Sequence, residues 1–104
     1  MNKRLFRGVI LETVLLNCIN SASQNGVHGY AIFTVIRRKF AVRLCPSTLY
    51  PELKLLETHG DIKSFWDNSE GKPRKKYTIT KEGQNLLKQY SAELRVVIPA
   101  LAAG

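Results

Sequence analysis

Apolar residues in the first twenty positions cover most of a helix surface rather than a single stripe. The residues concerned are Leu5, Phe6, Val9, Ile10, Leu11, Val14, Leu15, Leu16 and Ile19. This pattern predicts a helix from Leu5 to about Asn20. A helix that is apolar nearly all round is buried on more than one side. In so short a chain, we expect the second side to meet another subunit.

A second helix is predicted from about His28 to Phe40, after a polar, turn-forming loop at 20–26. Tyr30, Phe33, Ile36 and Phe40 recur at spacings of three, three and four residues. Residues at these spacings share one face of an α-helix. We therefore expect these four side chains to form the buried face of this helix.

The segment "PSTLYPELKLLETHG" at 46–60 predicts a third helix, although it contains two prolines. Pro46 suits the first helical position, where a missing N–H costs nothing. Pro51 should loosen the first turn and leave it open and irregular, and Gly60 is placed where a left-handed residue would end the helix. The buried stripe is expected at Leu49, Leu53 and Leu56, and the polar groups that reach outward from the first turn are Ser47, Thr48 and Tyr50.

Two β-prone runs, "DIKSFW" at 61–66 and "KYTIT" at 76–80, predict a hairpin. The polar segment between them contains Gly71 and Pro73 and is too long for a tight turn, so we expect a projecting loop. Thr80 can then cap a last helix that begins at about Lys81.

The last helix carries a second apolar stripe at heptad spacing. Its members are Leu87, Tyr90, Leu94, Val97 and Leu101. The stripe is only two heptads long, which is weak support for a coiled coil. It either folds back on the first helix or pairs with a second chain.

Charge narrows the choice of partners. The chain has 16 Lys and Arg against 8 Asp and Glu, a net charge of +8, which points to nucleic acid or an anionic membrane surface, or serves only solubility. Five basic residues and no acidic one lie between Lys72 and Lys81. Clustered Lys and Arg on a loop suit phosphate contact. The longest apolar runs are too short for a membrane span, so we expect no membrane partner.

Little in the sequence indicates catalysis or metal binding. Cys18 and Cys45 match no metal-ligand spacing, and Cys18 lies among apolar residues as a buried thiol would. Neither of the two histidines has an acidic or cysteine partner at ligand spacing. The basic, apolar N-terminus lacks a small-residue cleavage site typical of signal peptides. We therefore expect no metal, no cofactor, no enzymatic activity and a cytoplasmic location.

The order of these elements is helix, helix, helix, strand, basic loop, strand, helix. This is a mainly α arrangement with a small β-hairpin (α+β), and it corresponds to a winged helix-turn-helix of order α-α-α-β-β-α. We expect residues 1–80 to form the DNA-binding domain and residues 81–104 to form a dimerisation helix. In such a fold the third helix enters the major groove and the hairpin, the wing, follows the DNA backbone.

Three segments, "HGYAI" (28–32), "LCPSTLYPELKLLETHGDI" (44–62) and "GKPRKKYTITKEG" (71–83), resemble successive signature blocks of the PadR family of transcriptional regulators. The resemblance covers roughly residues 5–83 and implies a winged-helix homodimer that represses transcription by binding double-stranded DNA. Together with the charge pattern, it predicts the following DNA contacts: Ser47, Thr48, Tyr50 and Lys54 on the recognition helix, and Lys72, Arg74, Lys75 and Lys76 on the wing.

The short tail resembles the subfamily with a single C-terminal helix. In that subfamily, this helix and the first helix form the dimer interface. Here the resemblance and the apolar stripes together predict the interface residues Leu5, Val9, Leu87, Tyr90, Leu94, Val97 and Leu101. Relatives bind planar aromatic effectors near this interface, which leaves a small aromatic effector as a further predicted partner.

Some positions depart from the family pattern. Position 55 is Leu where Arg is usual, position 52 is Glu, and Cys45 replaces a helix-capping Ser. Glu52 either accepts a hydrogen bond from cytosine N4 or is a solvated residue near the helix N-terminus. Trp66 either packs against the base of the wing or lines an effector pocket.

The leading hypothesis is a homodimeric repressor that reads a short inverted repeat. A protein-interaction adaptor is the alternative, suggested by Glu52 and Leu55, which we expect on the outward side of the third helix. A non-specific architectural or RNA-binding protein is the third.

Overall fold

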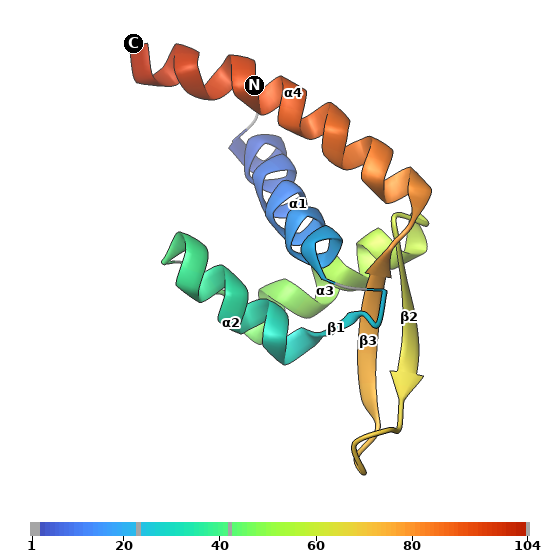
Figure 1. The fold of residues 1–104 in the computed structure, drawn as a ribbon. Coiled ribbons are helices and arrows are strands. Elements are labelled where there is room, and N and C mark those ends of the chain that lie inside the picture. Colours follow the sequence, from blue (N-terminus) through green and yellow to red (C-terminus); the bar gives the residue numbers. More distant parts are fainter. Residues whose placement is uncertain (1–2, 23, 42, 104) are drawn as a thin grey trace.

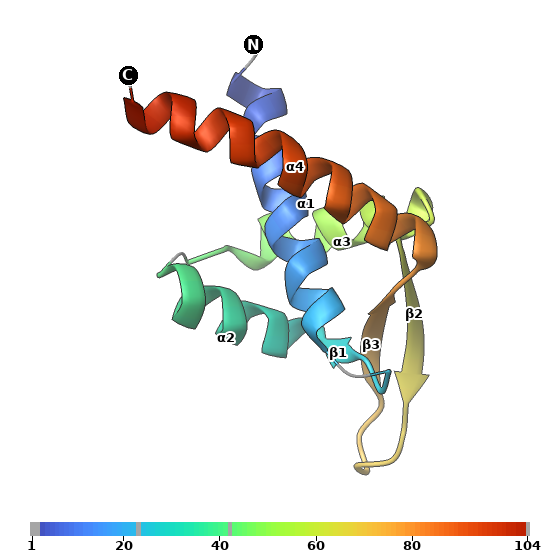
Figure 2. The ribbon, with the colours of Figure 1, turned by 45° about the horizontal axis from the view of Figure 1, so that its top comes forward.

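Helix α1 (Lys3–Ser21) is the central element, and the other elements pack around it (Figures 1 and 2). The computed structural model describes the backbone of residues 3–22, 24–41 and 43–103, and the side chains of residues 8–22, 24–41 and 43–95. The remaining elements are β1 (Val27–His28), α2 (Gly29–Phe40), α3 (Pro46–Thr58), β2 (Ile62–Asp67), β3 (Arg74–Ile79) and α4 (Lys81–Ala103).

The C-terminal half of α1 is enclosed by its own chain. Leu15 and Leu16 are fully buried, and α1 contacts α2, α3, β3 and α4. The nearly all-round apolar surface of this half is therefore explained within one chain, and it does not require a second subunit as the sequence suggested. Nearer the N-terminus of α1, Ile10 is exposed.

Three leucines of α3 belong to the hydrophobic core. Leu49, Leu53 and Leu56 are fully buried, which confirms the predicted stripe. They join a cluster whose other fully or nearly fully buried members are Leu15, Leu16, Ile19, Ile32, Ile36 and Ile62. This cluster fixes the orientation of α3 relative to the sheet, and so decides which side chains of α3 face outward.

The predicted buried face of α2 is only partly correct: Ile36 is buried and Phe33 packs against the core, but Tyr30 and Phe40 do not. Gly29, Ile32 and Ile36 are buried, whereas Tyr30 is 74% exposed and Phe40 is 47% exposed. Both sets are spaced as one helix face, so periodicity alone could not separate them. In the structure Ile32 and Ile36 join the core cluster, and the ring of Tyr50 packs onto Gly29, where a Cβ would lie 2.9 Å from Tyr50 Cε1.

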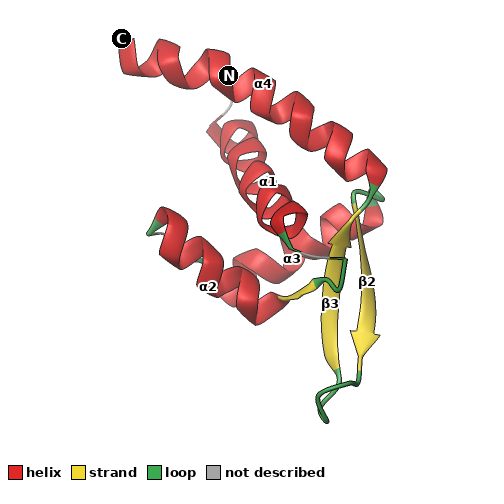
Figure 3. Ribbon diagram, viewed as in Figure 1, coloured by secondary structure: helices red, strands yellow, loops and turns green. Residues whose placement is uncertain are grey.

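The sheet has three antiparallel strands in the order β1-β3-β2 (Figure 3). The hairpin of β2 and β3 was predicted, with Ile62 opposite Ile79 and Asp67 opposite Arg74. Strand β1 was missed, because two residues cannot show a period of two. It pairs Val27 with Tyr77 and so ties the start of α2 to the wing. The α+β winged-helix fold is otherwise as predicted.

The predicted helix ends at Gly60 and Thr80 are confirmed. Gly60 has φ +81°, its N–H donates to Glu57 C=O at 3.0 Å, and Asp61 N–H donates to Leu56 C=O at 2.9 Å. These two bonds are a Schellman motif. The first turn of α3 is more regular than predicted, because the N–H groups of Thr48 and Leu49 both donate to Cys45 C=O.

Thr80 connects the start of α4 to the turn that follows α3. Its Oγ1 accepts from Gly83 N–H at 3.0 Å, as an N-cap residue does, and its hydroxyl donates to Gly60 C=O at 2.6 Å. The start of α4 is thereby held against the turn after α3. From there α4 crosses α1, and its C-terminal part extends beyond α1 in both views (Figures 1 and 2).

Candidate nucleic-acid interface

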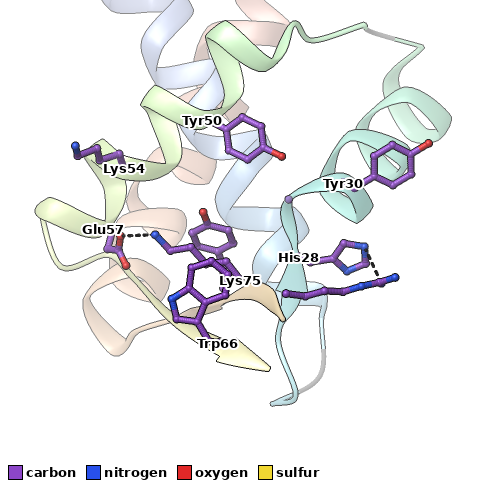
Figure 4. A pocket seen from close by; sticks show the side chains of 10 residues that line it. His28, Tyr30, Tyr50, Lys54, Glu57, Trp66 and Lys75 are labelled. Carbon is purple, nitrogen blue, oxygen red and sulfur yellow. Dashed lines mark hydrogen bonds and ion pairs between the residues drawn. The ribbon is translucent and has the colours of Figure 1, made fainter. Parts of the chain in front are cut away.

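One groove lies between α3, the start of α2 and the wing, and its cavity volume is about 720 Å³ (Figure 4). Tyr50 and Lys54 line it from α3, and Arg74 and Lys75 line it from β3. The structure thus brings together four of the predicted contact residues from the two elements. The other lining residues are His28, Gly29, Tyr30, Glu57, Trp66 and Tyr77.

The N-terminal turn of α3 is open to solvent. Ser47 and Thr48 are exposed, and so is Lys54 one turn after Tyr50. Tyr50 is held in place by an edge-to-face contact with Phe33, with ring centroids 6.1 Å apart and planes at 71°. Such a contact restricts the ring without covering it. The predicted contact face of α3 is therefore exposed and partly pre-ordered.

The wing cations differ in how firmly acidic residues hold them. Lys76 Nζ lies 2.7 Å from Asp67 Oδ2, and their side chains are only 17% and 22% exposed. Arg74 Nη1 lies 3.7 Å from Glu70 Oε2, and both of these side chains are well exposed. The same Arg74 atom lies 3.5 Å from His28 Nε2. A long, exposed ion pair contributes little and exchanges readily with phosphate. Arg74 is therefore available, whereas Lys76 is committed to the hairpin.

Asp67 is an acceptor at the base of the wing loop. Its carboxylate accepts from Lys76 and from Ser69 N–H at 2.9 Å. These bonds stabilise the ionised form and hold the pKa of Asp67 well below its usual range. At neutral pH the Asp67 carboxylate is therefore ionised.

Glu57 joins α3 to both wing strands. Its carboxylate accepts a hydrogen bond from the Ser64 hydroxyl and lies 3.9 Å from Lys75 Nζ. Lys75 Nζ also lies 5.9 Å from the centroid of the Tyr77 ring. Sequence reasoning did not select Glu57, although its position seven residues after Tyr50 places it on the same face of α3. It is a negative charge that any phosphate approaching Lys75 must displace or avoid.

Glu52 does not face the groove. It is half-buried on the side of α3 that meets α1, where burial raises its pKa and the carboxylate of Glu12 raises it further. This position on the side toward α1 gives no support to a contact between Glu52 and cytosine. Its spacing of three from Leu49 and four from Leu56 already placed it beside the buried stripe. Leu55, in contrast, is 43% exposed.

The apolar stripe of α4 folds back on its own chain in part. Leu87 packs against the core, and Leu94 is half-buried. Burial and a hydrogen bond to Glu12 raise the pKa of Tyr90 to about 12. Val9 on α1 is also half-buried. The side chains of Leu5, Val97 and Leu101 lie outside the described part of the chain.

Among the described residues, no group of His, Cys, Asp and Glu side chains could hold a metal ion, and no helix is long and apolar enough to cross a membrane. Cys18 is buried, as predicted, and its pKa is raised by that burial. Cys45 is exposed at the start of α3.

Solved structures resemble this chain over nearly its whole length. A transcriptional regulator from Clostridium thermocellum is 28% identical, with a TM-score of 0.82 and 97% of each chain covered. A PadR family transcriptional regulator from Eggerthella lenta is 30% identical, with a TM-score of 0.78, and the match covers 96% of this chain and 84% of the Eggerthella chain. A PadR family transcription regulator from Clostridium difficile is 26% identical, with a TM-score of 0.80, and the match covers 89% of this chain and 95% of the Clostridium difficile chain.

A comparison with curated proteins finds no match. The family model of the PadR-like transcriptional regulators matches residues 15–89, which include α2, α3 and the whole wing. Such regulators act by binding DNA and are not enzymes. With the winged-helix fold and the groove between α3 and the wing, this match shows that the chain belongs to the PadR-like family of DNA-binding transcriptional regulators.

Proposed function

We propose that the protein is a cytoplasmic, homodimeric repressor that reads a short inverted repeat in double-stranded DNA. The observation that carries this proposal is the common groove of α3 and the wing, lined by Tyr50 and Lys54 on one side and by Arg74 and Lys75 on the other. A duplex docked with α3 in its major groove would meet both sets at once.

The two elements have different tasks in this proposal. Ser47, Thr48, Tyr50 and Lys54 contact base edges and adjacent phosphates. Lys72, Arg74 and Lys75 bind the phosphate backbone without reading sequence. For Lys76, the fourth predicted wing contact, the pair with Asp67 supports a different task, which is to keep the hairpin closed.

The dimer is proposed from α1 and α4. Val9, Leu87, Tyr90 and Leu94 are only half-buried within one chain, and the C-terminal part of α4 extends beyond α1 (Figure 2). A second copy would cover this apolar surface and place two α3 helices on half-sites about one helical turn apart. Sedimentation tests this directly, because the chain mass is 11.7 kDa. A particle of that mass at micromolar concentration would refute the dimer. An aromatic effector near this interface stays a prediction from the resemblance.

The experiment for the repressor itself is selection of bound duplexes from a random pool, followed by anisotropy titrations. The selected duplex should bind far more tightly than a shuffled one, typically by 10³-fold or more. Thr48→Ala or Lys54→Ala should then reduce the preference between the two duplexes. Equal affinity for both duplexes in the wild type would indicate the non-specific alternative.

The adaptor alternative is weaker than the sequence suggested. Of the two residues that motivated it, Glu52 faces α1 and only Leu55 remains outward. A protein partner bound at low and high salt alike, with no DNA binding, would support it over the repressor.

A further inference from the structure

The largest aromatic side chain of the protein is exposed near the end of β2, close to the wing loop. Trp66, the only tryptophan, is 63% exposed. On the same face of β2, Ile62 is buried and Ser64 is half-buried, so exposure increases along the strand as it leaves the cover of α3. The sequence left two positions open for Trp66, packing against the wing base or lining a pocket, and in the structure its indole lines the groove (Figure 4).

The surroundings of Trp66 combine apolar surface with cations. Lys75 is its partner across the hairpin, and Arg74 lines the same groove. Tyr50 and Tyr30 lie across the groove on α3 and α2 (Figure 4). The one carboxylate that lines this groove within the described chain, Glu57, is engaged by Ser64 and Lys75. An occupant should therefore carry negative charge beside an apolar surface.

We propose that Trp66 is an apolar contact of the DNA backbone, whose indole packs against the deoxyribose of the strand that Lys75 and Arg74 hold by its phosphates. A nucleotide strand alternates anionic phosphates with largely apolar sugars, which matches an exposed ring that shares its groove with Lys75 and Arg74. This inference rests on the proposed DNA-binding function and assigns a further residue to it. It predicts a contribution that does not depend on base sequence.

Two arms test it on the full-length protein and the selected duplex. In the first, Trp66 fluorescence is followed during a DNA titration, with labelled-DNA anisotropy recorded in parallel. Binding should protect the indole from acrylamide quenching and change its emission. Because the chain has a single tryptophan, the signal needs no engineering. Anisotropy that rises while the indole stays equally quenchable would overturn the inference and leave the DNA-binding function standing.

In the second arm, Trp66→Ala should weaken the selected and the shuffled duplex by the same factor, on the order of tenfold, from lost apolar burial. Trp66→Phe should recover part of this loss. The slope of log K against log salt should not change, because no charge is removed. A wing that merely misfolds would lose its cation contacts and lower the slope, so the slope separates contact from structural damage.

Phe65→Ala provides a matched control. Phe65 is a similarly open aromatic residue, 40% exposed, one position earlier on β2, and it lies on the opposite face over Gly26. Its removal should leave DNA affinity nearly unchanged. A different outcome is that Trp66→Ala lowers the affinity for the selected duplex alone, and that this loss disappears when thymine in that duplex is replaced by uracil. That result would show a contact with a base and refute the contact with the sugar. Absence of binding to any duplex would refute the repressor and this inference together.

Discussion

Replacing Arg74 and Lys76 one at a time separates wing cations that bind phosphate from those that hold the hairpin together. The two side chains are close in sequence but differ in their partners. Arg74 lies 3.7 Å from Glu70 in an exposed pair, whereas Lys76 lies 2.7 Å from Asp67 in a largely covered one. We therefore expect the two alanine substitutions, which remove the same charge, to change different properties: DNA binding for Arg74 and stability for Lys76.

The expected magnitude follows from counterion release. Each phosphate neutralised contributes about 0.9 to the slope of log K against log salt. In a dimer, Arg74→Ala removes two contacts, so the slope should fall by about 1.8. Between 50 and 200 mM salt, the variant should then lose about tenfold less affinity than the wild type does. Lys76→Ala should keep the wild-type slope and lower the thermal midpoint instead.

The assay is labelled-DNA anisotropy at four or five salt concentrations, with thermal melting of each variant. Lys72→Ala serves as a companion to Arg74→Ala, because Lys72 is also exposed on the loop. Equal decreases in slope for Arg74→Ala and Lys76→Ala would refute the structural role given to Lys76. No change in any of the three variants would mean that the wing does not contact phosphate.

Three further predictions concern stability. Gly83→Ala should destabilise the fold by about 2 kcal/mol in urea unfolding, because its Cβ would collide with the Asp61 carbonyl and overpacking outweighs the ~1 kcal/mol gain in helix propensity; a more stable variant would contradict the packing described. Because the folded-state pKa of Asp67 is lowered, its contribution is complete above the unfolded pKa of about 3.9 and is lost as pH falls below it. Asp67→Asn should thus flatten the acid limb of stability against pH, and an unchanged limb would count against the ion pair. In an absorbance titration one tyrosine should ionise near pH 12, and Tyr90→Phe should abolish that step, since burial and Glu12 raise its pKa; stability from this group is present below pH 10 and lost between about 10 and 12.

Local signals made part of the fold predictable. Gly60 and Thr80 end and begin helices through hydrogen bonds within a few residues of themselves, so their roles could be read from the sequence. Leu49 and Leu56 lie on one side of a helix that had no competing apolar face. Such features depend on the chain near them and not on distant partners.

Other features depend on packing between distant segments. Strand β1 is two residues long and exists because Val27 meets Tyr77 from the wing. The buried face of α2 depends on the packing of Ile32 and Ile36 in the core, and nothing in the spacing of Tyr30 and the other aromatic residues indicates this. These errors therefore reflect tertiary contacts that local periodicity does not contain.

The candidate site divides in the same way. Placement of Tyr50 and Arg74 on a common groove followed from the order of elements. The partners of the wing cations did not, since the pairing of Lys76 with Asp67 depends on strand register. The exposure of Trp66 depends on where α3 stops covering β2. Glu52, in contrast, was misplaced despite a usable signal in its spacing from the buried leucines.

The central claim is that α3 and the wing hold the same DNA duplex from one side. The most direct test is to introduce a photo-crosslinking amino acid in place of Tyr50 or, separately, of Lys72, and to map the crosslinked nucleotides on the selected duplex. The account predicts crosslinks from both positions within one half-site, to base positions from Tyr50 and to flanking backbone from Lys72. Crosslinks from only one of the two positions, with binding intact in both variants, would contradict it.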